Sequence, residues 1–201
     1  MHIQYEIFQK NNTSLYDCIG IYENAVSPEF CQMLIEHFES SITFRTDDHR
    51  KQAQEMQLVG DPREESKMFV DALSDFIYPY GPKFERELHE HCHEDYKPKD
   101  PPLTESNNIH FRSFQIQKYT PEDKGYPAVH IEDGPEHCRK YLASILYLNT
   151  VLDGETVFPM CGRVIAPETG DLVIWPASLP FYHCGRASKS DKYIITTWFE
   201  F

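Results

Sequence analysis

The sequence predicts an α+β fold, with helices in the first half of the chain and short strands in the second. Two stretches before residue 109 carry apolar residues at three-to-four spacing, which is typical of helices with one buried face. After Asn108 the pattern changes to short β-branched and aromatic segments divided by Gly, Pro and Asp. No helical stretch separates these segments, so we expect antiparallel strands in a barrel or sandwich with the helices outside.

The first helix is predicted to begin at Ser27-Pro28-Glu29. Serine is a common N-cap, proline suits the first helical position, and an acid is favourable in the first turn. Apolar positions then recur through Phe38, and the helix is expected to end near Ser40.

A second helical stretch runs from about Glu64 to Asp95. The segment Pro79-Tyr80-Gly81-Pro82 interrupts it, because proline lacks a backbone donor and clashes with the preceding turn, so two helices are expected. Residues 41–63, rich in Asp, Arg and Gln, and the proline-containing residues 97–108 are interpreted as surface connections.

The strand candidates share β-branched or aromatic residues bounded by turn residues. They are 109–119, 127–132, 141–149, 156–158, 163–165, 171–176, 180–184 and 192–200.

Composition restricts the class of protein. The 201 residues are expected to form a single domain over 1–201, with helical support at about 1–108 and a β core at about 109–201. The net charge of −13 disfavours nucleic acid as a partner. No apolar run approaches the roughly 20 residues that span a bilayer, so no membrane partner is expected. The start lacks a secretory signal pattern, and the six cysteines show no CxxC pair, so we expect a cytoplasmic protein with reduced thiols.

The segment His130-Ile131-Glu132 lies on a predicted strand and is a candidate metal site. Residues two apart on a strand point to the same face, so both side chains can reach one ion. His183, beside a turn in a later strand candidate, is the best-placed third ligand. Two histidines and one carboxylate leave open positions on an octahedral metal, which suits non-haem Fe(II). Asp133 is the alternative carboxylate ligand.

The order of the surrounding segments carries more information than the His-x-Glu spacing. From Gln115 the chain reads QIQKY, YPAVHIEDG, LASILYLN, DGETVFP, VIAPETGDLVIWP, YHCG and KYIITTWF. This order closely resembles the prolyl 4-hydroxylase-like group of Fe(II)/2-oxoglutarate-dependent dioxygenases. The resemblance covers about residues 109–201.

The resemblance implies a double-stranded β-helix, a jelly-roll or cupin-like barrel with flanking N-terminal helices. It implies that the catalytic iron ligands are His130, Glu132 and His183. It implies that Lys192 grips the distal carboxylate of 2-oxoglutarate and that Tyr119 and Tyr147 lie near the cosubstrate. A lysine facing a barrel interior is costly to bury unpaired, and an incoming carboxylate supplies its partner. Further pocket candidates are Thr156, Thr196 and Trp198.

The activity implied by the resemblance is hydroxylation of a C–H bond. Fe(II) would be the metal, O₂ and 2-oxoglutarate the cosubstrates, succinate and CO₂ the released products, and ascorbate a candidate reductant. A prolyl residue of a peptide or protein is the first substrate candidate, by analogy within the group. A small-molecule substrate stays open.

Two departures from the family pattern keep other functions open. The family usually has His-x-Asp where this chain has Glu132, and Asp153 replaces the first Gly of the usual Gly-Gly-x-Thr. A non-catalytic binding protein on the same fold is therefore the main alternative, and a zinc hydrolase with the same ligands is a weaker one because HExxH is absent. Arg139 and Lys140 are both candidates for substrate contact.

Overall fold

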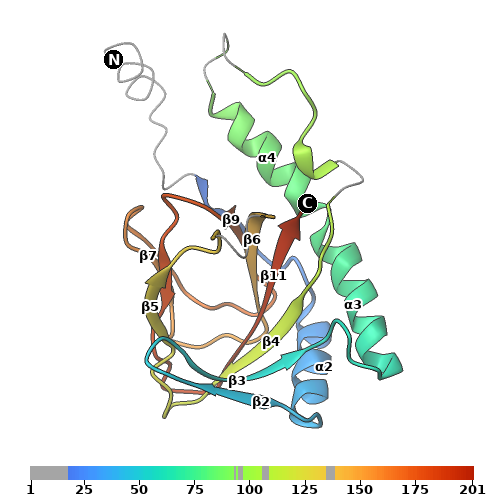
Figure 1. Cartoon of the computed structure of the whole chain (residues 1–201), viewed down its shortest axis with the longest axis vertical. Coiled ribbons are helices and arrows are strands. Elements are labelled where there is room, and N and C mark those ends of the chain that lie inside the picture. Colours follow the sequence, from blue (N-terminus) through green and yellow to red (C-terminus); the bar gives the residue numbers. More distant parts are fainter. Residues whose placement is uncertain (1–17, 93, 95–96, 106–108, 135–138) are drawn as a thin grey trace.

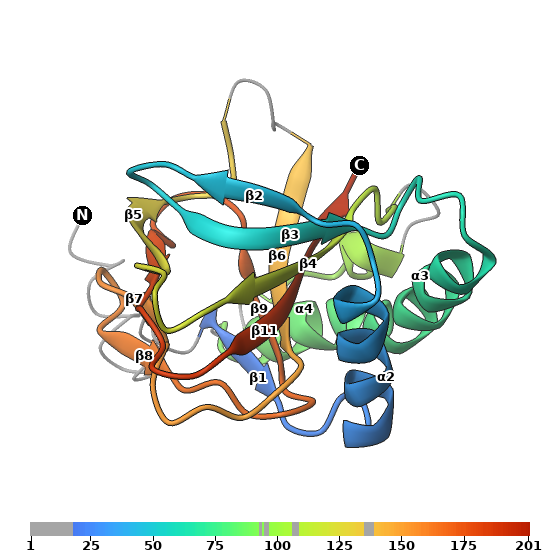
Figure 2. The ribbon, with the colours of Figure 1, turned by 90° about the horizontal axis from the view of Figure 1, so that it is seen from below.

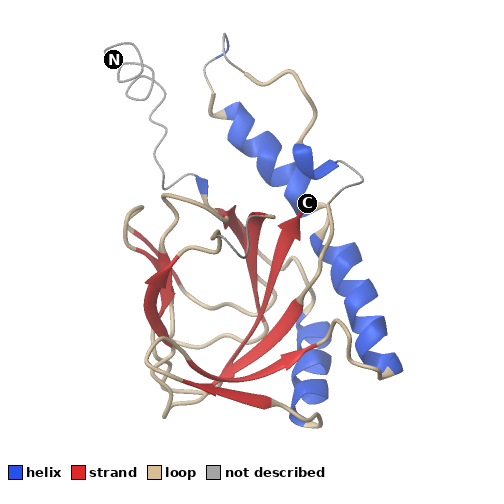
Figure 3. Cartoon of the chain, in the orientation of Figure 1, coloured by secondary structure: helices blue, strands red, loops and turns tan. Residues whose placement is uncertain are grey.

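The computed structural model describes residues 18–92, 94, 97–105, 109–134 and 139–201. Its strands are β1 (Gly20–Tyr22), β2 (Phe44–Asp47), β3 (Gln52–Gln57), β4 (Phe114–Tyr119), β5 (Tyr126–His130), β6 (Lys140–Tyr147), β7 (Thr156–Phe158), β8 (Arg163–Ile165), β9 (Leu172–Pro176), β10 (His183–Gly185) and β11 (Lys192–Glu200). Its helices are α2 (Pro28–Glu39), α3 (Glu64–Ile77) and α4 (Tyr80–Glu90), with a short 3-10 helix η3 (Leu103–Glu105). Figure 3 shows the helices gathered on one side of the strands. Within the described ranges, no helix is long and apolar enough to cross a membrane.

The strands form two sheets. The larger has the order β1-β9-β6-β11-β4-β3-β2, and the smaller has the order β5-β10-β7-β8. Every strand pair in the described residues is antiparallel, as expected. Figures 1 and 2 place β5 and β7 opposite β4 and β11. The two antiparallel sheets agree with the expected jelly-roll arrangement, but no strand pair among the described residues joins them, so the barrel is not closed.

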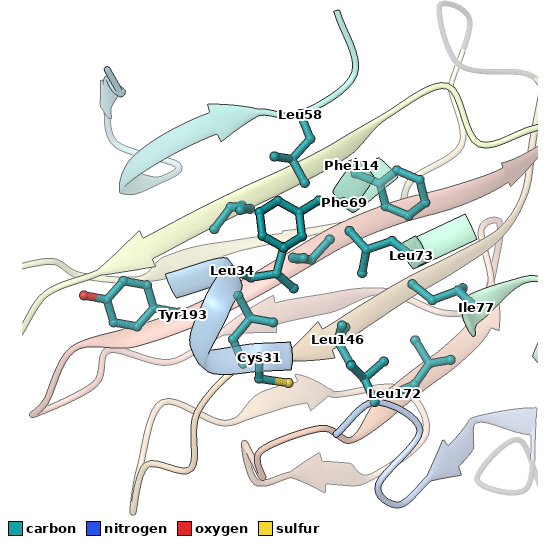
Figure 4. Close-up of a cluster of buried hydrophobic side chains, with 14 of the residues drawn as sticks. Cys31, Leu34, Leu58, Phe69, Leu73, Ile77, Phe114, Leu146, Leu172 and Tyr193 are labelled. Carbon is teal, nitrogen blue, oxygen red and sulfur yellow. The ribbon is translucent and has the colours of Figure 1, made fainter. Parts of the chain in front are cut away.

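The helices cover one face of the larger sheet. A hydrophobic cluster contains Leu34 of α2 and Leu73 of α3 (Figure 4), and Ile195 at the centre of β11 belongs to the same cluster. At the start of α4, Gly81 lies so close to Phe199 that a Cβ would sit 2.5 Å from the Phe199 ring. The absence of a side chain therefore allows α4 to pack directly on β11.

The first helix is confirmed. Ser27 caps α2 through a 3.3 Å bond from the Phe30 N–H to its hydroxyl, and Pro28 occupies the first helical position. The second stretch is two helices as expected, but the break is shorter, because α4 begins at Tyr80. Helix α4 ends at Glu90, and the expected end at Asp95 lies outside the described residues.

The interpretation of residues 41–63 as a surface connection is wrong. They contain the hairpin β2–β3, which extends the larger sheet beside β4. The hairpin is polar in sequence because its buried face carries Glu55, whose carboxylate is in close contact with Lys51 and Thr46. Paired polar groups can be buried in this way, and hydrophobic periodicity does not detect them.

Candidate metal centre

His130 and Glu132, two residues apart, meet the distant His183 at the smaller sheet. Strand pairing sets His130 of β5 directly opposite His183 of β10, and their ring centroids are 4.3 Å apart. Glu132 follows β5, and its backbone N–H donates to the Ala177 carbonyl at 3.0 Å. The potential ligand atoms of His130, Glu132 and His183 all lie within 4.8 Å of one another. In the part of the chain that the structure describes, this is the one group of three such residues arranged for a metal.

The hydrogen bonds of the two imidazoles favour metal binding. His130 Nδ1 lies 2.8 Å from the Ala128 carbonyl, and His183 Nδ1 lies 3.1 Å from the Phe181 carbonyl. A carbonyl only accepts, so each Nδ1 carries a proton, and in the neutral imidazole Nε2 is left to offer its lone pair to a metal. Both Nε2 atoms face Glu132 Oε1, at 3.5 Å from His130 and 3.3 Å from His183. Two imidazole nitrogens and one carboxylate oxygen form a donor set that fits Fe(II).

Glu132 is ionised in this setting. Burial raises the pKa of its carboxyl, but the neighbouring His130 and His183 and the charge of Lys140 outweigh burial and hold that pKa well below its usual value. The other proposed carboxylate, Asp133, does not join the cluster of ligand atoms. The structure thus brings Glu132 to the two imidazoles and leaves Asp133 outside.

A cavity of about 170 Å³ lies between the two sheets beside these three residues. Its walls come from both sheets and from the hairpin. Its lining includes Lys51, Gln115, Gln117, Tyr119, Tyr126, Thr156, Trp175, Lys192, Ile194, Thr196 and Trp198.

Lys192 reaches this cavity from the start of β11. Only 3% of the residue is exposed, and burial lowers the pKa of its ammonium to about 8, despite the charges of Glu155 and Asp153. Its Nζ donates to the Gly154 carbonyl at 2.7 Å. Among the described residues this is its one hydrogen bond, so two of its three N–H donors are left for an incoming anion.

The two tyrosines expected near the cosubstrate differ in their position relative to the cavity. Tyr119 lines the cavity, its ring lies 4.9 Å from Lys192 Nζ, and its hydroxyl donates to Gln117 at 2.6 Å. Tyr147 is absent from the cavity wall. Its hydroxyl donates at 2.7 Å to Thr156 Oγ1, and Thr156 does line the cavity. Tyr147 therefore supports a wall residue.

Several wall residues were not predicted. Gln115 and Gln117 alternate with Ile116 on β4, so the period-2 pattern in QIQKY could have placed both on the Tyr119 face. Gln117 donates at 3.0 Å to Thr196 Oγ1. Tyr126 stacks on His130 with ring centroids 4.1 Å apart.

The strand region of the chain matches a known protein family. Residues 114–200 match the 2OG-Fe(II) oxygenase superfamily. The match contains all three candidate ligands and Lys192, and it confirms the resemblance noted from the sequence. Proteins of this family use Fe(II) and 2-oxoglutarate, the two cofactors that the sequence analysis expects. No curated protein matches the chain.

Several solved structures share the fold of this chain. A Pseudomonas putida prolyl-4-hydroxylase is 12% identical over 98% of this chain and 97% of its own, with a TM-score of 0.64. The viral collagen prolyl hydroxylase of Paramecium Bursaria Chlorella virus-1, in a 2OG complex, is 17% identical over 91% and 95%, with a TM-score of 0.61. A Trichoplax adhaerens prolyl hydroxylase, in complex with a hypoxia inducible factor peptide fragment, is 14% identical over 100% and 93%, with a TM-score of 0.58.

Proposed function

We propose that the protein is an Fe(II)/2-oxoglutarate-dependent dioxygenase that hydroxylates a C–H bond, with a prolyl residue of a peptide or protein as its substrate. The observation that carries this proposal is the meeting of His130, Glu132 and His183 beside the buried ammonium of Lys192 in one cavity. A hydrolase with the same three ligands has no use for that ammonium.

The chain's own residues would hold the metal and the cosubstrate. His130 and His183 would bind Fe(II) through Nε2, and Glu132 through Oε1. When bound, Fe(II) supplies the redox chemistry that couples decarboxylation of 2-oxoglutarate by O₂ to hydroxylation, with succinate and CO₂ as products. The protein would otherwise contribute the orientation of the reacting groups.

Lys192 would select the cosubstrate. Its buried ammonium has donors to spare, and a second carboxylate on the ligand would supply the missing opposite charge. The hydroxyl of Thr156, fixed by Tyr147, lies on the same cavity wall. This arrangement favours a diacid over a monoacid.

The prolyl part of the proposal rests on structural neighbours. Two of the similar folds are described as a collagen prolyl hydroxylase and a prolyl hydroxylase bound to a peptide fragment. Of the two basic residues considered for substrate contact, Lys140 is already bound to Glu132, whereas Arg139 is exposed. We therefore favour Arg139 as a substrate contact.

An anaerobic titration tests the proposal. Purified protein is titrated with Fe(II) and 2-oxoglutarate, and the visible charge-transfer band of the chelate is recorded. His130→Ala should abolish the band by removing the metal, and Lys192→Ala should raise the 2-oxoglutarate concentration required while sparing metal binding. A wild-type spectrum from both variants would refute the assignment of these residues.

Turnover separates the alternatives. Under air, the enzyme should convert 2-oxoglutarate to succinate, and a proline-containing peptide that is its substrate should gain one oxygen atom by mass spectrometry. The chelate band without succinate would indicate a binding protein, and hydrolysis without 2-oxoglutarate would indicate a zinc hydrolase.

A further inference from the structure

The two oxygens of the Glu132 carboxylate have different surroundings. Oε1 faces the Nε2 atoms of both candidate histidine ligands. Oε2 accepts a 3.0 Å hydrogen bond from the indole Nε1 of Trp198 and lies 3.3 Å from Lys140 Nζ. The outer oxygen is therefore occupied by two donors.

These two donors contact each other and come from the opposite sheet. Lys140 Nζ lies 3.5 Å from the Trp198 ring centroid, a cation–π contact. Lys140 begins β6 and Trp198 lies on the paired strand β11. The side chains of Lys140 and Glu132 are only 12% and 15% exposed, so solvent screening of their ion pair is weak. We call Trp198 and Lys140 the carboxylate clamp.

We propose that the carboxylate clamp positions Glu132 so that a single oxygen, Oε1, is presented to the metal. The proposal rests on the assignment of His130, Glu132 and His183 as the metal site. A carboxylate can bind a cation through one or both oxygens. With Oε2 held by two donors, binding through both oxygens would break these contacts, and a position on the metal is kept for another ligand.

The clamp also compensates for the longer side chain. Glutamate has one more rotatable bond than aspartate, so an unanchored carboxylate loses more rotamer freedom when it binds a metal. Two bonds to the outer oxygen fix the side chain in advance. Partners of this kind typically contribute 10–100-fold to metal affinity. Trp198 and Lys140 are thus positioning residues, and their removal should weaken metal binding.

The chain offers a matched control for the loss of an indole. Trp175 lines the same cavity, but its buried Nε1 has no hydrogen-bond partner among the described residues. Trp198→Phe and Trp175→Phe make the same chemical change in the same cavity. Only the first removes a donor from Glu132.

The test is calorimetric titration of the full chain with Mn²⁺, which requires no turnover. Trp198→Phe should lower Mn²⁺ affinity about 10–100-fold. Trp175→Phe should lower it less, because the Trp175 ring packs against the His183 imidazole at 4.9 Å between centroids but donates no hydrogen bond to Glu132. Lys140→Met keeps the apolar stem over the Trp198 ring and removes the charge, so it should also lower affinity. Thermal midpoints in EDTA show that each variant is folded, and Lys140→Met carries the test if Trp198→Phe does not fold.

A double-mutant cycle tests the link to Glu132. Glu132→Asp shortens the carboxylate and withdraws it from the clamp, so Trp198→Phe should cost little affinity in that background. Equal losses from Trp198→Phe and Trp175→Phe would overturn the clamp, as would losses from Trp198→Phe and Glu132→Asp that multiply independently. His183→Ala tests the metal-site assignment separately from the carboxylate clamp. If this variant keeps Mn²⁺ affinity, the proposed metal site itself is wrong.

Discussion

Replacing Lys192 by methionine should stabilise the apo protein while destroying its affinity for 2-oxoglutarate. The ammonium is buried, and its one bond within the described residues is to the Gly154 carbonyl, so in the absence of ligand it is a charge without a charged partner in contact. Methionine has a similar length and no charge. A residue kept for binding is expected to reduce stability in this way.

The magnitude follows from the pKa of the Lys192 ammonium, about 8 in the folded protein against 10.5 for an ordinary lysine. Each tenfold change in a protonation equilibrium corresponds to about 1.4 kcal/mol, so the folded state holds the charge about 3 kcal/mol less favourably than the unfolded chain. Losing the bond to the Gly154 carbonyl costs about 1–2 kcal/mol in return. We expect Lys192→Met to raise the free energy of unfolding by about 1–2 kcal/mol at pH 7.

The assay is urea unfolding of metal-free protein at pH 7, paired with calorimetry of 2-oxoglutarate binding to the Mn²⁺ form. Affinity for 2-oxoglutarate should fall about 100-fold or more in the variant, because a buried charge pair loses one partner. Lys118→Met is a control that should change the free energy of unfolding in the opposite direction. Although burial opposes its charge, hydrogen bonds with Glu39, Tyr193 and Asp191 raise the pKa of Lys118, so removing that charge should destabilise the protein.

The pH dependence provides an independent check. Between pH 8 and 10.5 the unfolded chain keeps the Lys192 proton that the folded chain has lost. The contribution of Lys192 to the free energy of unfolding of the wild type therefore rises with pH across this window. In Lys192→Met this contribution should be absent. A variant that is less stable than wild type at pH 7, or one that binds 2-oxoglutarate normally, would refute the reasoning.

Three further predictions concern the metal centre and its surroundings. Glu132→Gln should lower Mn²⁺ affinity more than about 100-fold by calorimetry, whereas Asp133→Asn should bind normally; the reverse result would make Asp133 the ligand. Saturating Mn²⁺ at about 100 times its dissociation constant should raise the free energy of unfolding of the wild type by about 3 kcal/mol in urea. EDTA should remove this gain, and Glu132→Gln should not show it at the same Mn²⁺ concentration. Gly154 has a φ of +78°, and a Cβ there would lie 3.0 Å from Ser188 Cβ and 3.2 Å from Lys192 Cδ. Gly154→Ala should therefore lower the free energy of unfolding by about 1–2 kcal/mol and weaken 2-oxoglutarate binding, and a fully stable variant would contradict this account.

Local chemistry allowed much of the fold to be predicted from the sequence. The N-cap and proline of α2 act within one helical turn, so the start of that helix is correct. The strands at 156–158, 163–165 and 192–200 are also correct, because they alternate or are continuously apolar and are bounded by turn residues. The hairpin at 44–57 could not be found in this way, since its partner strand β4 lies far along the chain and its buried acid is paired with Lys51.

The sequence by itself determined which residues are candidates for the site. The two-residue spacing of His130 and Glu132 places both on one strand face, and His183 is a third candidate because it lies beside a turn in a later strand candidate. Lys192 was indicated by the family resemblance. Only the tertiary structure decided how these groups are arranged. In the structure, His183 lies opposite His130 across a strand pair, Tyr147 lies behind Thr156, and Trp198 donates to the outer oxygen of Glu132. The physical reason is that strand register sets which residues lie opposite each other within a sheet, packing of one sheet against the other sets the contacts between sheets, and no local pattern in the chain specifies either.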